Sequence, residues 1–133
     1  MNNKWVVMNQ ETEAKILNLM ARDDILRIDI EGKDIQNKNA FMESIEEILQ
    51  FPSKCEGKFS RFDDWIRDLS WLPSDKGICI QIKNYQEFMM NDIRNKDKIE
   101  KIFQQDVLPF WECDVVKTVK GGKPREFYVV VIP

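Results

Sequence analysis

Three short apolar segments, separated by stretches long enough to hold helices, most constrain the fold of this 133-residue chain. Residues 25–30 and 78–82 alternate apolar and polar side chains, which is the period of a β-strand. Residues 127–132 form a continuous apolar run, which suits a strand covered on both faces. Strands joined by helical crossovers favour a mainly parallel sheet. We therefore expect an α/β fold, with a small, mainly parallel sheet flanked by helices.

Helical periodicity and stop signals divide the rest of the chain. Asn37 is a candidate N-cap, and Pro109 is expected to end the last helix. Helices are predicted at 11–22, 38–50, 59–71, 85–95 and from 97. A short strand is predicted at 4–8. Residues 115–119, the Gly121-Gly122 turn and residues 127–132 predict a C-terminal β-hairpin. The cations expected to protect its edge from aggregation are Lys117, Lys120, Lys123 and Arg125.

Composition fits a single folded unit. Apolar residues make up 43% and charged residues 32% of the chain, enough for one ordinary core without disulfides or metals. The three cysteines are widely spaced and form no CxxC pair, so neither a disulfide framework nor a zinc site is indicated. We expect Cys55, Cys79 and Cys113 to be reduced, with Cys79 buried between two isoleucines.

Several functional classes are disfavoured by residues that the sequence lacks. It has no histidine, the commonest general base and transition-metal ligand, so no metal or other cofactor is expected. The adjacent acids Asp23-Asp24 and Asp63-Asp64 are interpreted as solvated charge. A net charge of −3 with scattered basic residues argues against direct binding of nucleic acid. No apolar run approaches the roughly 20 residues of a membrane span, and Met1–Trp5 lacks a signal-peptide pattern, so we expect a cytoplasmic protein.

One segment carries a specific resemblance. The segment begins at Pro52 and ends with Arg67-Asp68-Leu69-Ser70-Trp71-Leu72, and the match described next runs over it without a gap. This stretch resembles the recognition segment of the barstar family. The family pattern is Pro, an aromatic pair, Gly, a polar residue and Asn, then a helix with two Asp four residues apart. In many members that same Arg-Asp-Leu-Ser-Trp-Leu motif closes it. Weaker similarity extends over residues 27–133. We therefore expect one barstar-like domain over 1–133, in which 1–24 form a less typical N-terminal extension.

The resemblance implies an inhibitor and not an enzyme. In this family the loop and second helix face a ribonuclease, and acidic side chains occupy its phosphate-binding cleft. It implies a cytoplasmic immunity protein, in toxin–antitoxin or contact-dependent inhibition systems, that binds one cognate toxin as a monomer in a 1:1 complex. The toxin would be a ribonuclease or another nuclease. Carboxylates facing Arg and Lys make charge-assisted hydrogen bonds and accelerate encounter, which makes such mimicry physically sound.

This chain departs from the family pattern inside the same segment. The first family Asp falls on Ser60 and the second on Asp64. The two loop aromatics fall on Lys54 and Cys55, and the family glycine falls on Glu56. One of two key carboxylates is therefore absent, and a cation stands where an aromatic is usual. These departures leave open an alternative, a barstar-fold immunity or adaptor protein that binds a non-nuclease partner or a surface away from an active site.

A helical wheel places the candidate residues on the predicted helix. Ser60, Asp64, Arg67 and Trp71 share one line, opposite the apolar stripe. Arg61 or Arg67 lies within reach of Asp64, so an intrahelical ion pair competes with partner binding. Trp71 could be an exposed anchor, although a Trp at a helix end more often packs under the next loop. The predicted partner-binding residues are Lys54, Glu56, Gly57, Ser60, Asp63, Asp64, Arg67, Asp68 and Trp71. An unrecognised enzyme that uses Asp63 or Asp64 is the least favoured alternative.

Overall fold

The computed structural model describes residues 3–133 and contains one four-stranded, all-parallel sheet. The strands follow the order β1-β4-β3-β2 and span Lys4–Val7 (β1), Ile25–Glu31 (β2), Gly77–Lys83 (β3) and Phe127–Val131 (β4). The α-helices are Glu13–Met20 (α1), Lys38–Leu49 (α2), Phe59–Ile66 (α3), Ile93–Lys101 (α4) and Val115–Thr118 (α5). A 3₁₀ turn spans Gly32–Asp34 (η1), and π-helical stretches span Ile102–Val107 (η2) and Phe110–Asp114 (η3).

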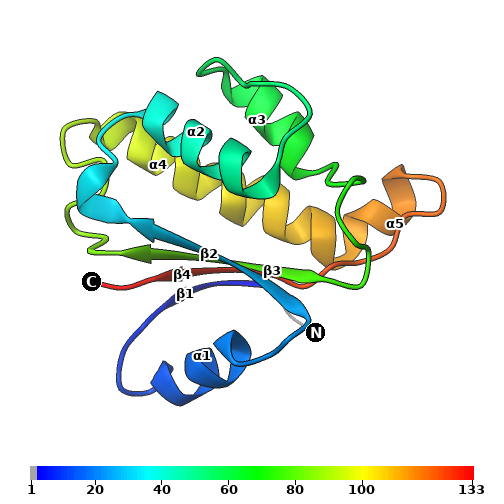
Figure 1. Cartoon of the computed structure of the whole chain (residues 1–133), viewed down its shortest axis with the longest axis horizontal. Helices are drawn as coiled ribbons and strands as arrows, with labels where there is room; N and C mark the ends of the chain where they lie inside the picture. The colour runs from blue at the N-terminus through cyan, green and yellow to red at the C-terminus, as the bar shows by residue number, and fades with distance from the viewer. Residues whose placement is uncertain (1–2) are drawn as a thin grey trace.

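The layers of the fold are visible in Figure 1. Helices α2 to α5 lie on one face of the sheet, and α1 lies alone on the other. The sheet joins segments that are far apart in sequence, because Ile28 registers with Ile80 and Ile80 registers with Val129. All but the last residue of β3 and all but one of β4 are buried. The predicted α/β class, its parallel sheet and the double-sided burial of the last strand are confirmed.

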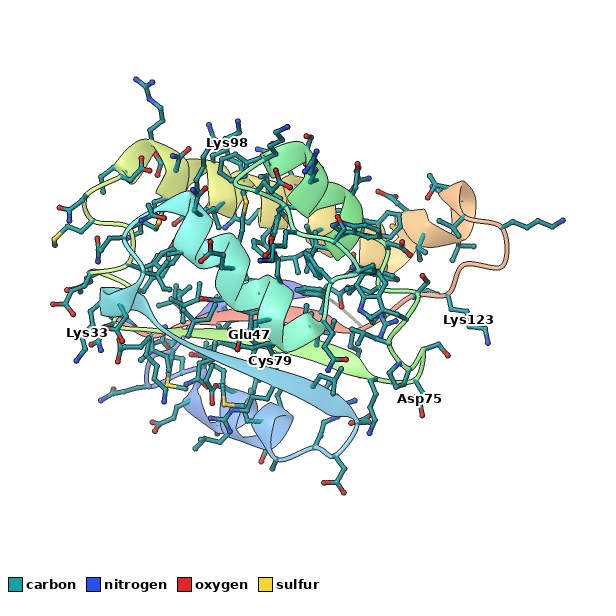
Figure 2. All side chains as sticks on the ribbon, turned by 45° about the horizontal axis from the view of Figure 1, so that its top comes forward. Lys33, Glu47, Asp75, Cys79, Lys98 and Lys123 are labelled. Carbon is teal, nitrogen blue, oxygen red and sulfur yellow. The ribbon has the colours of Figure 1, made fainter. Side chains whose placement is uncertain are left out.

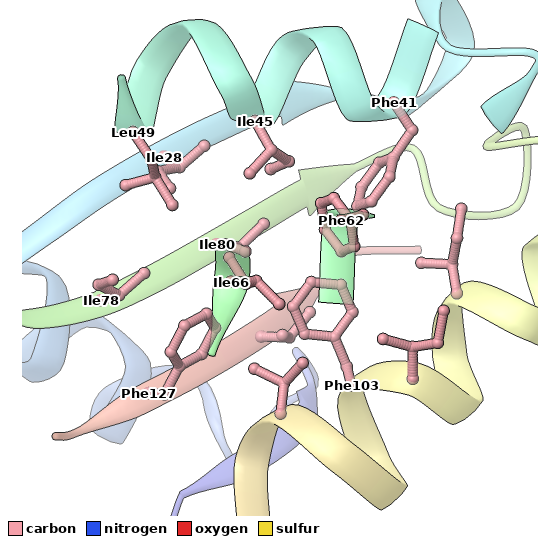
Figure 3. Close-up of a cluster of buried hydrophobic side chains, with 14 of the residues drawn as sticks. Ile28, Phe41, Ile45, Leu49, Phe62, Ile66, Ile78, Ile80, Phe103 and Phe127 are labelled. Carbon is pink, nitrogen blue, oxygen red and sulfur yellow. The ribbon is translucent and has the colours of Figure 1, made fainter. Parts of the chain in front are cut away.

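The main core lies between the sheet and the helices above it. Figure 3 shows Phe41, Phe62 and Phe103, from α2, α3 and η2, pointing toward one another, with ring centroids 5.7 to 6.3 Å apart. All three side chains are at most 1% exposed. Because three helices meet in one aromatic cluster, the position of α3 depends on α2 and η2.

A smaller core lies under α1, where Ile16 packs on the other face of the sheet. Its strand residues are Ile25, Cys79 and Val130, so the predicted burial of Cys79 is confirmed. At the start of α2, Asn37 Oδ1 accepts a hydrogen bond from the N–H of Ala40 at 2.8 Å, which confirms the predicted N-cap.

The predicted C-terminal hairpin is wrong. Residues Val115–Thr118 form helix α5, and Phe127–Val131 pair in parallel with β1 and β3. The alternation of 115–119 resembles a strand, but Val115 is buried against the core while Val116 is exposed. Gly121, with φ of +73°, turns the chain from α5 toward β4 and not between paired strands.

The helical segments after β3 also differ from prediction. Residues 85–90 form turns, and the next helix begins at Ile93, four residues before the predicted start. Asp92 caps it by accepting a hydrogen bond from the N–H of Asn95. Pro109 does not end the helical segment in which it lies, because helical geometry continues from η2 through Pro109 into η3. The wide turns of η2 come immediately before it, where ordinary α-helical geometry would press its ring against the carbonyl of Gln105.

Within the described residues 3–133, the helices are all too short or too polar to cross a membrane. In the same part of the chain, no cluster of three or more Cys, Asp or Glu side chains is arranged to hold a metal ion.

Candidate functional site

The loop between α2 and α3 is fixed to α2 by a few specific contacts. The N–H of Cys55 donates to Glu46 Oε1 at 2.6 Å, and the Cys55 side chain is fully buried. Gly57 lies against Asn39 with φ of +71°, and an added Cβ would stand 2.1 Å from Asn39 Oδ1. A glycine is therefore required at this position, and the loop presents Lys54 and Glu56 to solvent from a defined backbone.

Helix α3 is shorter than predicted and ends at Ile66, not at Trp71. Phe62 and Ile66 anchor it in the core, and Ser60 and Asp64 on other faces are exposed. The carbonyl of Ile66 accepts a hydrogen bond from Trp111 Nε1 at 2.9 Å. Leu69 then adopts a φ of +51°, which turns the chain out of the helix. The Arg67–Leu72 motif thus forms the exit from α3 and not its last turns.

Asp63 and Asp64 are adjacent but lie in different environments. Asp63 Oδ1 accepts from Arg67 Nε at 3.0 Å, and its side chain is 21% exposed. Burial, together with the negative charges of Asp106 and Asp64, raises the pKa of Asp63 despite the Arg67 guanidinium. Asp64 is 79% exposed, and its nearest contact to Arg67 is 3.9 Å. The intrahelical ion pair predicted at Asp64 forms instead mainly at Asp63, which leaves Asp64 as the accessible carboxylate.

Trp71 packs inward and does not stand out as an anchor. Its Nε1 donates to the carbonyl of Leu49 at 2.8 Å, at the end of α2. Its ring lies 5.6 Å from that of Trp65 and 5.9 Å from that of Phe51, both in edge-on contact. Packing under the neighbouring segment, the better supported of the two sequence readings, is confirmed. Trp71 therefore positions the surface instead of forming its exposed centre.

The N-terminal end of α3 is surrounded by cations from other helices. The Nζ atoms of Lys38 and Lys98 lie 5.5 and 4.7 Å from the centre of the Phe59 ring. Figure 2 shows Lys98 at this end of the molecule, on the same side as α3. Arg61 lies on the same helix, 3.5 Å from Glu56. The surface is therefore divided, with basic side chains at the start of α3 and acidic ones toward its end.

Sequence reasoning did not find several residues that complete this surface. Asp106 of η2 lies close enough to raise the pKa of Asp63. Together with Arg67, Phe110 and Asp114, it lines a small cleft of about 260 Å³ beside α3. Asp106, Phe110 and Asp114 lie 40 to 48 positions after the end of α3 in the sequence. Periodicity along the sequence does not tell which helices pack side by side, so it could not place these residues next to α3.

Arg125 was predicted to guard a sheet edge, but it is only 6% exposed. Its Nη1 donates to the carbonyls of Pro73 and Lys76 at 2.9 and 2.7 Å, and its guanidinium lies 5.0 Å from the centre of the Trp111 ring. Burial lowers the pKa of Arg125. The side chain joins the chain after α3 to the C-terminal segment and so holds the far end of the candidate surface in place.

The side chains at this surface are mainly carboxylates and cations, which can form charge-assisted hydrogen bonds. Cys55 is the thiol of the loop, and burial raises its pKa to about 12, so it is not a nucleophile near neutral pH. Lys54, Glu56, Ser60, Asp64 and Asp68 are exposed, whereas Gly57 is buried. Asp63, Arg67 and Trp71 are half-buried behind them.

The fold and this surface define a small α/β protein with a parallel sheet, helices packed over one face, and an outer loop and helix of mixed charge. Comparison with protein families matches residues 25–131 to Barstar (barnase inhibitor). The chain belongs to the barstar family, whose members are inhibitors that bind a nuclease and are not enzymes. The match begins at the first residue of β2, so β1 and α1 lie outside it. Comparison with curated proteins gives no match.

Proposed function

We propose that this protein is a cytoplasmic immunity protein that neutralises one cognate toxin, most simply a nuclease, by covering its active site. The contact surface is the loop 54–58 and the exposed side of α3, extended by Asp68 and Asp106. Each chain binds one toxin molecule. The observation that carries the proposal is Asp64, a 79% exposed carboxylate on a helix held by the aromatic core.

Electrostatics explain why such a surface suits a nuclease. A nuclease cleft must be cationic to hold phosphates, and an exposed carboxylate can form charge-assisted hydrogen bonds there. Because α3 and its loop are fixed by buried groups, little conformational entropy is lost on binding. Ser60 stands where the family has a carboxylate, and Asp64 and Asp106 supply the negative charge in its place. Asp63 contributes little, because its charge is largely neutralised by Arg67.

A second candidate is supported by the cations at the start of α3. Lys38, Lys54 and Lys98 would meet a cationic cleft unfavourably, and they suit a partner with an acidic patch. The protein would then be a barstar-fold immunity or adaptor protein for a partner that is not a nuclease, or for a surface outside the active site.

Neutralisation of the toxin encoded beside the gene tests the first candidate. The purified chain is titrated against that toxin with RNA, DNA and non-nucleic substrates in parallel. Asp64→Asn should weaken inhibition and reduce its salt dependence, whereas Asp75→Asn, an exposed acid in the turn before β3, should not. Equal inhibition by both variants would exclude the proposed surface.

The two candidate functions predict opposite effects of Lys54→Ala on the affinity for the partner. If the loop enters a cationic cleft, Lys54→Ala removes a repulsion and tightens binding. If the partner is acidic, the same change weakens binding. Lys54 is exposed and makes no ion pair within residues 3–133, so the substitution should leave the stability of the chain unchanged.

A further inference from the structure

The outer edge of β2 is a long, regular and uncovered strand edge. β2 is the last strand of the sheet and runs for seven residues, with no proline in it. Figure 2 shows it in front of β3, with no other helix or strand over its outer side. Regular edges of this length are able to pair with another strand, and proteins commonly block them with proline, bulges, covering loops or charged side chains. The side-chain charges on this edge therefore decide which partner strand it can accept.

The direction of the backbone groups of β2 follows from its pairing with β3. The N–H of Gly77 donates to the carbonyl of Asp24 at 2.8 Å, and Ile25 registers with Gly77. In a parallel ladder this directs the even-numbered residues of β2 toward β3 and the odd-numbered ones outward. The ladder to β3 therefore uses the even-numbered residues, and outside it no hydrogen bond within residues 3–133 reaches the backbone N–H or carbonyl of Arg27 or Asp29. Both residues therefore have free donors and acceptors at the edge.

The side chains of these two residues carry opposite charges. Arg27 Nε lies 3.1 Å from Asp29 Oδ1, and each side chain is 44% exposed. If two copies pair antiparallel about a two-fold axis at Ile28, Arg27 of each lies opposite Asp29 of the other. The outward backbone groups then also face each other as hydrogen-bonded pairs. An axis at Arg27 or at Asp29 would instead place like charges opposite, which is unfavourable.

We propose that two copies of this chain associate through β2, with the two-fold axis at Ile28, to form one continuous eight-stranded sheet. On the opposite face of the strand, half-buried Leu26 of each copy would lie beside Ile30 of the other and lose exposed apolar surface. In Figure 1, α3 lies beyond α2 from this edge, so self-association and partner binding use different surfaces. The dimer would replace the monomer expected from the sequence when the chain is concentrated.

The association is weak, because a single strand edge buries less area than a standard protein interface. Sedimentation equilibrium over a concentration series of the full chain is therefore the direct measurement. A reversible monomer–dimer equilibrium is expected. A chain that stays monomeric at every concentration would overturn the proposal.

A charge exchange tests the register. Arg27→Asp and Asp29→Arg each place like charges opposite and should weaken the dimer by about tenfold. The double variant Arg27→Asp/Asp29→Arg restores opposite charges and should recover wild-type dimerisation. Lys123→Asp, a charge reversal of the same size at an exposed residue between α5 and β4, is the control. Circular dichroism confirms that each variant is folded. A dimer that the single variants leave unchanged, or that the folded double variant fails to recover, would show that β2 is not the interface.

Discussion

Gly57→Ala should destabilise the protein through two separable costs, one from the backbone and one from a side-chain clash. A residue with a Cβ at φ of +71° costs about 1–2 kcal/mol. The new Cβ would also stand 2.1 Å from Asn39 Oδ1, which forces that side chain to move and adds about 1 kcal/mol. The total is about 2–3 kcal/mol. For 133 residues each kcal/mol lowers the melting temperature by about 3–4 °C.

A second glycine separates these costs. Gly121 has nearly the same φ, +73°, but nothing lies within 4 Å of an added Cβ, so Gly121→Ala measures the backbone cost alone. Asn39→Ala in the Gly57→Ala background removes the clash. The loss in free energy of unfolding should then fall to the value measured for Gly121→Ala. Urea unfolding of the four combinations at Gly57 and Asn39 gives the coupling energy. If Gly57→Ala costs no more than Gly121→Ala, or Asn39→Ala recovers nothing, the contact does not shape this loop.

Three further predictions concern the core and the charges beside the site. Phe103→Ala should cost about 3–5 kcal/mol in urea unfolding, because its ring joins three helices, and a loss near 1 kcal/mol would contradict that role. Arg125→Lys should lower the free energy of unfolding by about 2–3 kcal/mol, because hydrogen bonds to the carbonyls of Pro73 and Lys76 are lost. Lys123→Ala, at an exposed position, should leave the free energy of unfolding unchanged. Equal losses in the two variants would argue against the buried network. The folded state raises the pKa of Asp63, so its contribution to stability is favourable below the unfolded pKa and is lost as pH rises through the folded pKa. Asp63→Asn should remove that part of the pH dependence, and an unchanged pH profile would refute the assignment.

The sequence predicted the elements whose local pattern agrees with their tertiary environment. The strands at 25–30 and 78–82 and the helix after Asn37 were found because alternation, helical periodicity and a capping side chain all favour the observed structure. The end of α3 could not be found in this way. It depends on Trp111, more than 40 residues away, which satisfies the carbonyl of Ile66.

The C-terminal third was misread for a related reason. Pro109 normally ends a helix, and a run of β-branched residues near paired glycines usually indicates a hairpin. Here the π-helical turns before Pro109 and the burial of Val115 keep the chain helical into α5. Phe110 and Asp114, which line the cleft beside α3, lie on that continuation, so an error in the helix also concealed part of the surface.

An all-parallel sheet also determines when this protein can fold. Lys4 of β1 registers with Tyr128 of β4, so β1 pairs with a strand that is synthesised 124 residues later. At typical translation rates this separation corresponds to a delay of about 6 to 25 s. During that time the apolar residues of β1 have no partner strand and are exposed to chaperones or to aggregation. Folding on the ribosome would therefore begin without β1, and the sheet would be completed only after β4 has emerged.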